Sequence, residues 1–198
     1  MSPISVSGLV LGLVLGGVCI YPLHLFNSDS LVYGVTLSTP EDTAIEVVHI
    51  LPPEIIVIPS INLKTSVEYI GITSTGEMDT PKDSMNVGWY ALGVAPGATG
   101  TALITGHYGW KSKKKSAFDN LSKLRVNDMV TTINALGVST TFIVTAIKSY
   151  PYTATTTDIF VTNDQEAHLN LITCSGTWNK KAKSYSNRLV IFTNKKLD

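Results

Sequence analysis

Three side chains of different chemistry stand at the ends of apolar, strand-like runs. Cys174 ends one run, His107 follows a second after a single glycine, and Arg188 begins a third. A thiolate can attack a carbonyl, an imidazole can protonate a leaving amine, and a guanidinium can stabilise charge on oxygen. We therefore predict that Cys174, His107 and Arg188 form a catalytic site for acyl transfer. Two cations beside the thiol are expected to lower its pKa.

Cys174 and His107 each have an ordinary alternative, which for His107 is a loop histidine without a function. Cys174 can be a small buried hydrophobe, as most free cysteines are. The other cysteine, Cys19, lies in an apolar N-terminal segment, so Cys174 lacks a disulfide partner in its own part of the chain. Arg188 is one of only two arginines among 15 basic residues, and its planar fork can donate two parallel hydrogen bonds, which lysine cannot. His168 lies six residues from Cys174 on one strand, about 20 Å away, which leaves His107 as the candidate base.

The elements that must position these residues are mostly strands. Short β-branched runs separated by Gly, Pro, Asn and Asp predict a closed β-barrel or a sandwich. Two short helices are predicted, at Val87–Leu92 and at Ala117–Leu124, where Phe118, Leu121 and Leu124 recur at helical spacing. The predicted strands are Ile55–Ile58, Ser66–Ile72, Thr101–Thr105, Met129–Asn134, Thr140–Lys148, His168–Cys174 and Leu189–Thr193.

The first 26 residues have the composition of a membrane helix. No charged side chain occurs from Ile4 to Phe26, which is long enough to cross about 30 Å of hydrocarbon. We predict an uncleaved transmembrane signal anchor at 1–26, an extracytoplasmic stalk at 27–54 and a catalytic domain at 55–198. The chain is then a single-pass protein of the cell membrane with an extracellular catalytic domain. A cleaved signal peptide is the main alternative, but neither a basic start nor a small-residue cleavage site is evident.

Composition excludes some classes of protein. The chain is 44% hydrophobic and only 15% charged, with a mean hydropathy of +0.20, so it is not a disordered chain. Its net charge is zero, because the 15 basic residues balance the 15 acids. The first lysine or arginine in the chain is Lys64. Residues 64–198 therefore carry a net positive charge, but it is too small to indicate nucleic-acid binding.

The order of these motifs resembles the sortases, a family of cell-surface cysteine transpeptidases. The similarity spans residues 55–195, and it is closest to class F, with classes E and D as alternatives. It departs from the family where Asn170 replaces the usual Thr and where Asn127 replaces the usual Gly. It rests on Leu171-Ile172-Thr173-Cys174, Arg188 within Ser186–Val190, Gly88-Trp89-Tyr90, Pro96–Gly100, Thr105-Gly106-His107, and the residues from Ala117 to Val130.

The resemblance implies a mainly β fold, an eight-stranded sortase-type barrel with short helices. It also implies a two-step reaction in which Cys174 cleaves an LPxTG-like sorting signal through a thioester. An amine of the cell wall or of another protein then resolves the thioester. His107 would be the general acid and base, and Arg188 would bind the substrate backbone and the oxyanion. We expect no cofactor and no metal, because the acidic residues are scattered along the sequence.

Further residues are candidates for substrate binding. Thr173 precedes the nucleophile, Trp178 and Tyr185 lie between Cys174 and Arg188, and Pro151–Thr157 is a second candidate wall of the groove. Two other functions stay open at this point. The same constellation can end in hydrolysis, as in a thiol protease, or the chain can be a non-enzymatic surface β-domain with an inert thiol. The L,D-transpeptidases are less suitable, since they usually carry an arginine soon after the cysteine.

Overall fold

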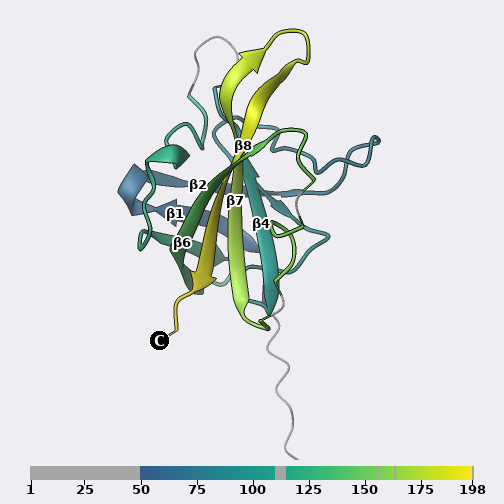
Figure 1. Ribbon diagram of the computed structural model, residues 1–198. Coiled ribbons are helices and arrows are strands. Elements are labelled where there is room, and N and C mark those ends of the chain that lie inside the picture. Colours follow the sequence, from purple (N-terminus) through teal and green to yellow (C-terminus); the bar gives the residue numbers. More distant parts are fainter. Residues whose placement is uncertain (1–49, 110–114, 156, 163, 198) are drawn as a thin grey trace, which may run out of the picture. The chain divides into compact units, whose positions relative to one another are not determined.

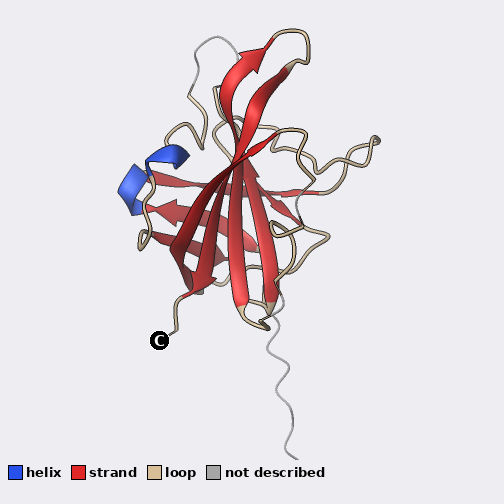
Figure 2. Cartoon of the chain, viewed as in Figure 1, coloured by secondary structure: helices blue, strands red, loops and turns tan. Residues whose placement is uncertain are grey.

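The computed structural model describes residues 50–197 except 110–114, 156 and 163. These residues belong to one compact unit, Glu46–Asp198. Its elements are β1 (Pro53–Ile58), η1 (Pro59–Ile61), β2 (Leu63–Ile70), β3 (Val87–Tyr90), β4 (Gly100–Gly106), η3 (Leu121–Lys123), β5 (Met129–Asn134), β6 (Ser139–Pro151), β7 (Ala167–Asn179) and β8 (Ser184–Lys195) (Figures 1 and 2).

The strands close into a barrel in the order β1-β2-β3-β4-β7-β8-β6-β5. Two neighbouring pairs are parallel, β2 with β3 and β4 with β7, and the other pairs are antiparallel. Because β4 and β7 run side by side in the same direction, residues at their C-terminal ends meet at one rim (Figure 1). The eight-stranded barrel predicted from the sequence is therefore confirmed.

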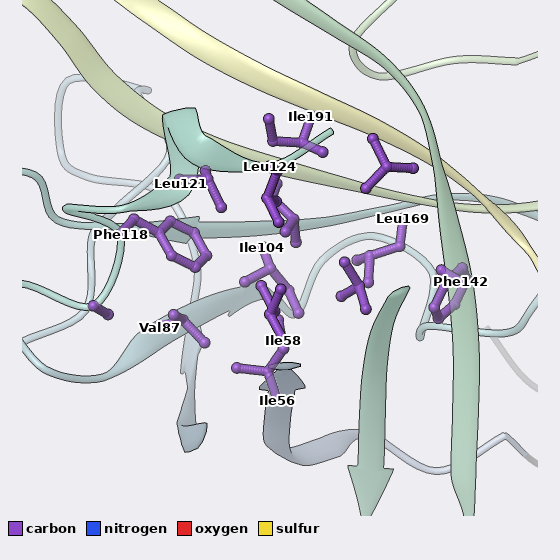
Figure 3. Packing of buried hydrophobic residues seen from close by; sticks show 14 of the residues in the cluster. Ile56, Ile58, Val87, Ile104, Phe118, Leu121, Leu124, Phe142, Leu169 and Ile191 are labelled. Carbon is purple, nitrogen blue, oxygen red and sulfur yellow. The ribbon is translucent and has the colours of Figure 1, made fainter. Parts of the chain in front are cut away.

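Strand alternation divides the apolar side chains into two clusters. Leu169 of β7 packs in the barrel interior with Ile104 of β4 (Figure 3). Leu171 of β7 belongs to the same cluster. Ile172 of β7 and Leu103 of β4 belong to a second cluster on the outer face. A strand with apolar side chains on both faces has a continuous run of hydrophobic residues in the sequence, and β4 and β7 both have such a run.

The helix predicted at Val87–Leu92 is wrong. Residues 87–90 form β3, which pairs with β2 on one side and β4 on the other. Val87, Gly88 and Trp89 are all buried, so no alternation marks the strand. Gly88 is needed for packing, since a Cβ there would lie 2.8 Å from Cγ2 of Ile70.

The helix predicted at Ala117–Leu124 is also corrected. Only Leu121–Lys123 is helical, and it is a 3₁₀ turn. The apolar residues Phe118, Leu121 and Leu124 are nevertheless all buried in the core (Figure 3). Their spacing of three matches the three residues per turn of a 3₁₀ helix better than the 3.6 of an α-helix.

The seven predicted strands are present, and five of them contain the whole predicted range and extend beyond it. The predicted Met129–Asn134 matches β5, and the predicted Ser66–Ile72 corresponds to β2, which begins at Leu63 and ends at Ile70. β7 continues past Cys174 to Asn179 and β8 begins at Ser184, so the two form a hairpin that extends beyond the rest of the barrel (Figure 2). Asn127, where relatives usually carry glycine, has φ of 76°. Asparagine tolerates this left-handed conformation better than other non-glycine residues, which explains the substitution.

The predicted membrane anchor at 1–26 and most of the stalk at 27–54 lie outside the described residues. Within the part of the chain that the structure describes, no helix has the length and apolar character needed to span a bilayer. The anchor and the domain boundaries therefore stay predictions.

Candidate active site

Cys174 and Arg188 lie directly opposite each other on neighbouring strands. They are Cα partners in the antiparallel pair of β7 and β8, so their side chains share one face of the sheet. This is the outer face, because Cys174 alternates with Thr173, which points into the barrel. Both Cys174 and Arg188 are half-buried. The sequence prediction that these two residues meet agrees with this register.

His107 reaches the same place from β4. Thr105 pairs with Ile172 in the parallel ladder, and two residues further along each strand stand His107 and Cys174. The alternation along β4 puts Leu103 on the outer face, and His107 follows it at even spacing. The carbonyl of His107 accepts a hydrogen bond from the backbone N–H of Phe118 (3.1 Å), which fixes the chain as it leaves the strand.

The three residues line a single cleft of about 1030 Å³. Its floor is the outer face of the sheet around Cys174 and Arg188. One wall is the connection from β2 to β3, which contributes residues 76–80, and another is the connection from β6 to β7. The second wall includes Tyr152, Ala154 and Thr155, which lie within the predicted groove segment Pro151–Thr157. Ligand-binding clefts typically combine apolar walls with a few polar groups, as this one does.

The β6–β7 connection is held over the sheet by buried contacts. Ile159 packs in the outer apolar cluster with Ile172. Asn170 is 2% exposed, and its amide donates to the carbonyl of Ile159 (2.7 Å). The hydroxyl of Tyr150 donates to Asp158 (2.7 Å), and burial together with this bond raises the pKa of Tyr150 to about 12. The residue that departs from the family motif, Asn170, therefore anchors a wall of the cleft.

The residues predicted to bind substrate do not all behave alike. Trp178 and Tyr185 line the cleft and are Cα partners in the extended hairpin, with ring centroids 5.2 Å apart. The side chain of Thr173, in contrast, is 2% exposed and donates its hydroxyl to the carbonyl of Gly106 (2.7 Å). That hydroxyl ties β7 to β4, while Thr173 still lines the cleft, so its role in substrate binding stays a prediction.

The electrostatics of the thiol differ from the sequence-based expectation. Burial raises the pKa of the Cys174 thiol, and the nearby charge of Arg188 opposes this only in part. The net direction is upward, so the expectation of a lowered pKa is wrong. The half-buried sulfur is poorly solvated, and one guanidinium does not compensate. A neutral thiol must therefore give up its proton when it attacks, which requires a base in the cleft.

This shift gives the first expected result. Because the pKa of Cys174 is raised, its thiolate fraction at neutral pH is small and grows as the pH rises above the ordinary thiol range. In a Cys19→Ala background, iodoacetamide should react slowly with Cys174 at pH 7. The rate should increase through a midpoint above that of the urea-unfolded chain. A folded-state midpoint below the unfolded one, measured by mass spectrometry, would contradict the effect of burial.

Functional residues missed by sequence reasoning lie in the loops. Tyr108 contacts Tyr185 edge-on, with ring centroids 5.3 Å apart, and so joins the His107 loop to the hairpin. Pro81 is buried, and its carbonyl lies 2.8 Å from Nε2 of His107. No local pattern could have indicated either contact, because both join segments that are far apart in the chain.

One cluster with metal-ligand chemistry lies at the other end of β7. Ligand atoms of Asp164, Glu166 and His168 are within 4.8 Å of one another, so these acids are less scattered than the sequence suggested. The ring of His168 already bonds Asp164 (2.9 Å) and Asn194 (3.1 Å). We interpret the cluster as a set of hydrogen bonds that fixes the start of β7. The absence of a metal requirement stays a prediction.

Comparison with known proteins assigns the fold to a family. The sortase domain family matches residues 56–196. Similar solved structures include sortase C1 of Streptococcus agalactiae (21% identity, TM-score 0.57, 73% of this chain and 67% of that chain). Sortase C-1 of Actinomyces oris is similar at 24% identity (TM-score 0.55, 73% of each chain). A lid mutant of Corynebacterium diphtheriae sortase A is similar at 23% (TM-score 0.56, 73% and 70%).

A comparison with curated protein sequences gave no significant match. The family match nevertheless covers most of the chain and includes β4, β7 and β8, the strands that position His107, Cys174 and Arg188. An inert surface β-domain is therefore no longer a suitable interpretation. The chain belongs to the sortase family of cysteine transpeptidases.

Proposed function

We propose that this protein is a membrane-anchored sortase that attaches surface proteins through an LPxTG-like sorting signal. The observation that carries the proposal is the pairing of Cys174 with Arg188 across β7 and β8, in a cleft that His107 also lines. Class F is the class we propose from the sequence motifs. The N-terminal segment at 1–26 would place the catalytic domain outside the cell.

The proposed reaction assigns one task to each residue. As the Cys174 sulfur attacks the carbonyl of the Thr–Gly bond, its proton passes to His107. The tetrahedral oxyanion accepts hydrogen bonds from the Arg188 guanidinium. His107 then protonates the leaving amine, the C–N bond breaks, and a thioester remains on Cys174. An amine donor attacks the thioester, loses its proton to His107 and releases the thiol.

The dimensions of the cleft support a peptide substrate. The volume of about 1030 Å³ lies at the upper limit of the roughly 300–1,000 Å³ that is usual for ligand pockets, so the cleft is large enough for several residues of a peptide. Ile159 and Ile172 provide apolar surface beside Cys174, and Trp178 and Tyr185 provide aromatic surface at the hairpin. These residues would bind the side chains of the sorting signal, while Arg188 contacts its backbone.

The test is to trap the acyl-enzyme. The protein is incubated with a panel of LPxTG-type peptides, with and without an amine such as triglycine, and analysed by mass spectrometry. We expect a thioester adduct on the tryptic peptide that carries Cys174, which disappears when the amine is added. Cys174→Ala should give no adduct and no product. If no peptide in a broad panel acylates Cys174, the proposal is wrong.

The same experiment separates transfer from hydrolysis. A transpeptidase yields amide product in proportion to the added amine, whereas a hydrolytic cysteine peptidase yields the free acid whether or not the amine is present. We expect the amide to dominate at millimolar amine.

A further inference from the structure

The His107 imidazole contacts a backbone carbonyl that no sequence motif assigns to the site. Its Nε2 lies 2.8 Å from the carbonyl oxygen of Pro81, in the connection between β2 and β3. A carbonyl can only accept a hydrogen bond, so Nε2 carries the proton and donates it. In the neutral ring, Nδ1 is then the basic nitrogen. Pro81 is buried and His107 is half-buried, so water reaches this bond only from one side.

The same peptide group contacts a carboxylate at its other end. The N–H of Lys82, which shares its peptide plane with the Pro81 carbonyl, donates to Oε2 of Glu68 on β2 (2.8 Å). The planar amide therefore links the Glu68 carboxylate to the His107 ring in one hydrogen-bonded chain. A charge-assisted bond at the N–H end polarises the amide and strengthens its carbonyl as an acceptor.

Two further bonds keep Glu68 in this position. Its Oε1 accepts hydrogen bonds from the N–H of Asp83 (3.2 Å) and from the side-chain amide of Asn86 (3.0 Å). Burial raises the pKa of Glu68, but the bonds from Lys82, Asn86 and Asp83 outweigh it, so the net shift is downward. The carboxylate is consequently ionised at neutral pH.

We propose that Glu68 is a positioning residue that orients the His107 ring and fixes its tautomer through the Pro81–Lys82 peptide group. The arrangement resembles in effect the carboxylate that orients the histidine in serine proteases, with a peptide group inserted between the two side chains. The catalytic consequence of this inference rests on the proposed function, whereas the effect of Glu68 on the imidazole does not. The other titratable groups that line the same cleft are Cys174, Arg188, Glu77, Asp79, Tyr108, Tyr152 and Tyr185.

Two substitutions separate the charge of Glu68 from its place in the fold. Glu68→Gln keeps an acceptor oxygen but removes the charge, and Glu68→Ala removes the clamp. We expect kcat to fall about 10- to 100-fold in Glu68→Ala and less in Glu68→Gln, with KM nearly unchanged, as for loss of one charge-assisted hydrogen bond. Glu54→Gln, an exposed carboxylate on β1, is the matched control and should leave kcat unchanged.

The direct readout is ¹⁵N NMR of the His107 ring, which requires no substrate. The wild type should show the Nε2–H tautomer. In Glu68→Ala the tautomer should become mixed, and in Glu68→Gln the share of the Nε2–H tautomer should fall by less. Circular dichroism confirms that each variant is folded. If the tautomer populations are the same in all variants, Glu68 is only a structural clamp and the inference is wrong. If the wild type acylates no peptide but the NMR changes occur, the proposed function fails while the inference holds.

Discussion

Replacing Arg188 by lysine should lower kcat/KM for the proposed transpeptidation about 10²- to 10³-fold without unfolding the barrel. This is the usual loss when one oxyanion donor is removed. The guanidinium is held by three oxygens of its own strand, with bonds to Ser184 Oγ (3.2 Å), the Tyr185 carbonyl (3.4 Å) and the Asn187 carbonyl (3.2 Å). A lysine ammonium keeps the charge but loses the planar fork that these contacts orient toward a carbonyl. Steady-state kinetics with the best peptide of the panel measures the effect.

A second variant separates geometry from charge at this position. Because the charge of Arg188 lowers the pKa of Cys174, Arg188→Gln should raise that pKa further and slow alkylation of the thiol at a fixed pH near 8. Arg188→Lys should alkylate at close to the wild-type rate while its turnover is lost. Arg125→Lys, at the other arginine of the chain, which is exposed, is the control and should be silent in both assays. Near-normal turnover of Arg188→Lys would contradict a specific role for the guanidinium.

Sequence reasoning succeeded where a residue's position depends on strand ends. Cys174, His107 and Arg188 each flank an apolar run, and in a closed barrel strand ends must meet at a rim. The register that puts Cys174 opposite Arg188 then follows from the hairpin between β7 and β8. The chemical type of each residue and its position beside an apolar run were enough to predict the candidate site.

Sequence reasoning failed where a strand is buried on both faces and where two loops meet. The strand β3 was taken for a helix because Val87, Gly88 and Trp89 are all buried and show no period of two. The contact of His107 with Pro81 joins residues 26 positions apart, and nothing in either segment specifies it. The pKa of Cys174 depends on how far the sulfur is desolvated, which is a property of packing.

Phe118 links the core to the site, and its replacement should lower the stability of the domain strongly. It is fully buried, its ring lies against Gly106, and its N–H holds the carbonyl of His107 (Figure 3). Phe118→Ala should lower the free energy of unfolding by about 3–5 kcal/mol, as expected for a large cavity. That is a substantial part of the roughly 5–15 kcal/mol that stabilises a typical domain. Urea denaturation followed by tryptophan fluorescence measures it.

The matched control is Phe142, which is equally buried but far from the cleft. Phe142 lies on β6 opposite Lys195, and its neighbour Ile143 pairs with Asn194 of β8. Asn194 in turn pairs with His168 of β7, which is six residues, or about 20 Å, from Cys174 along that strand. Phe142→Ala should lose similar stability but keep its turnover at a temperature where both variants are folded. Phe118→Ala should lose turnover under the same conditions, because the cavity lets Gly106 and His107 move relative to Cys174. Equal turnover of the two folded variants would show that His107 is held by the strands and the Pro81 contact alone.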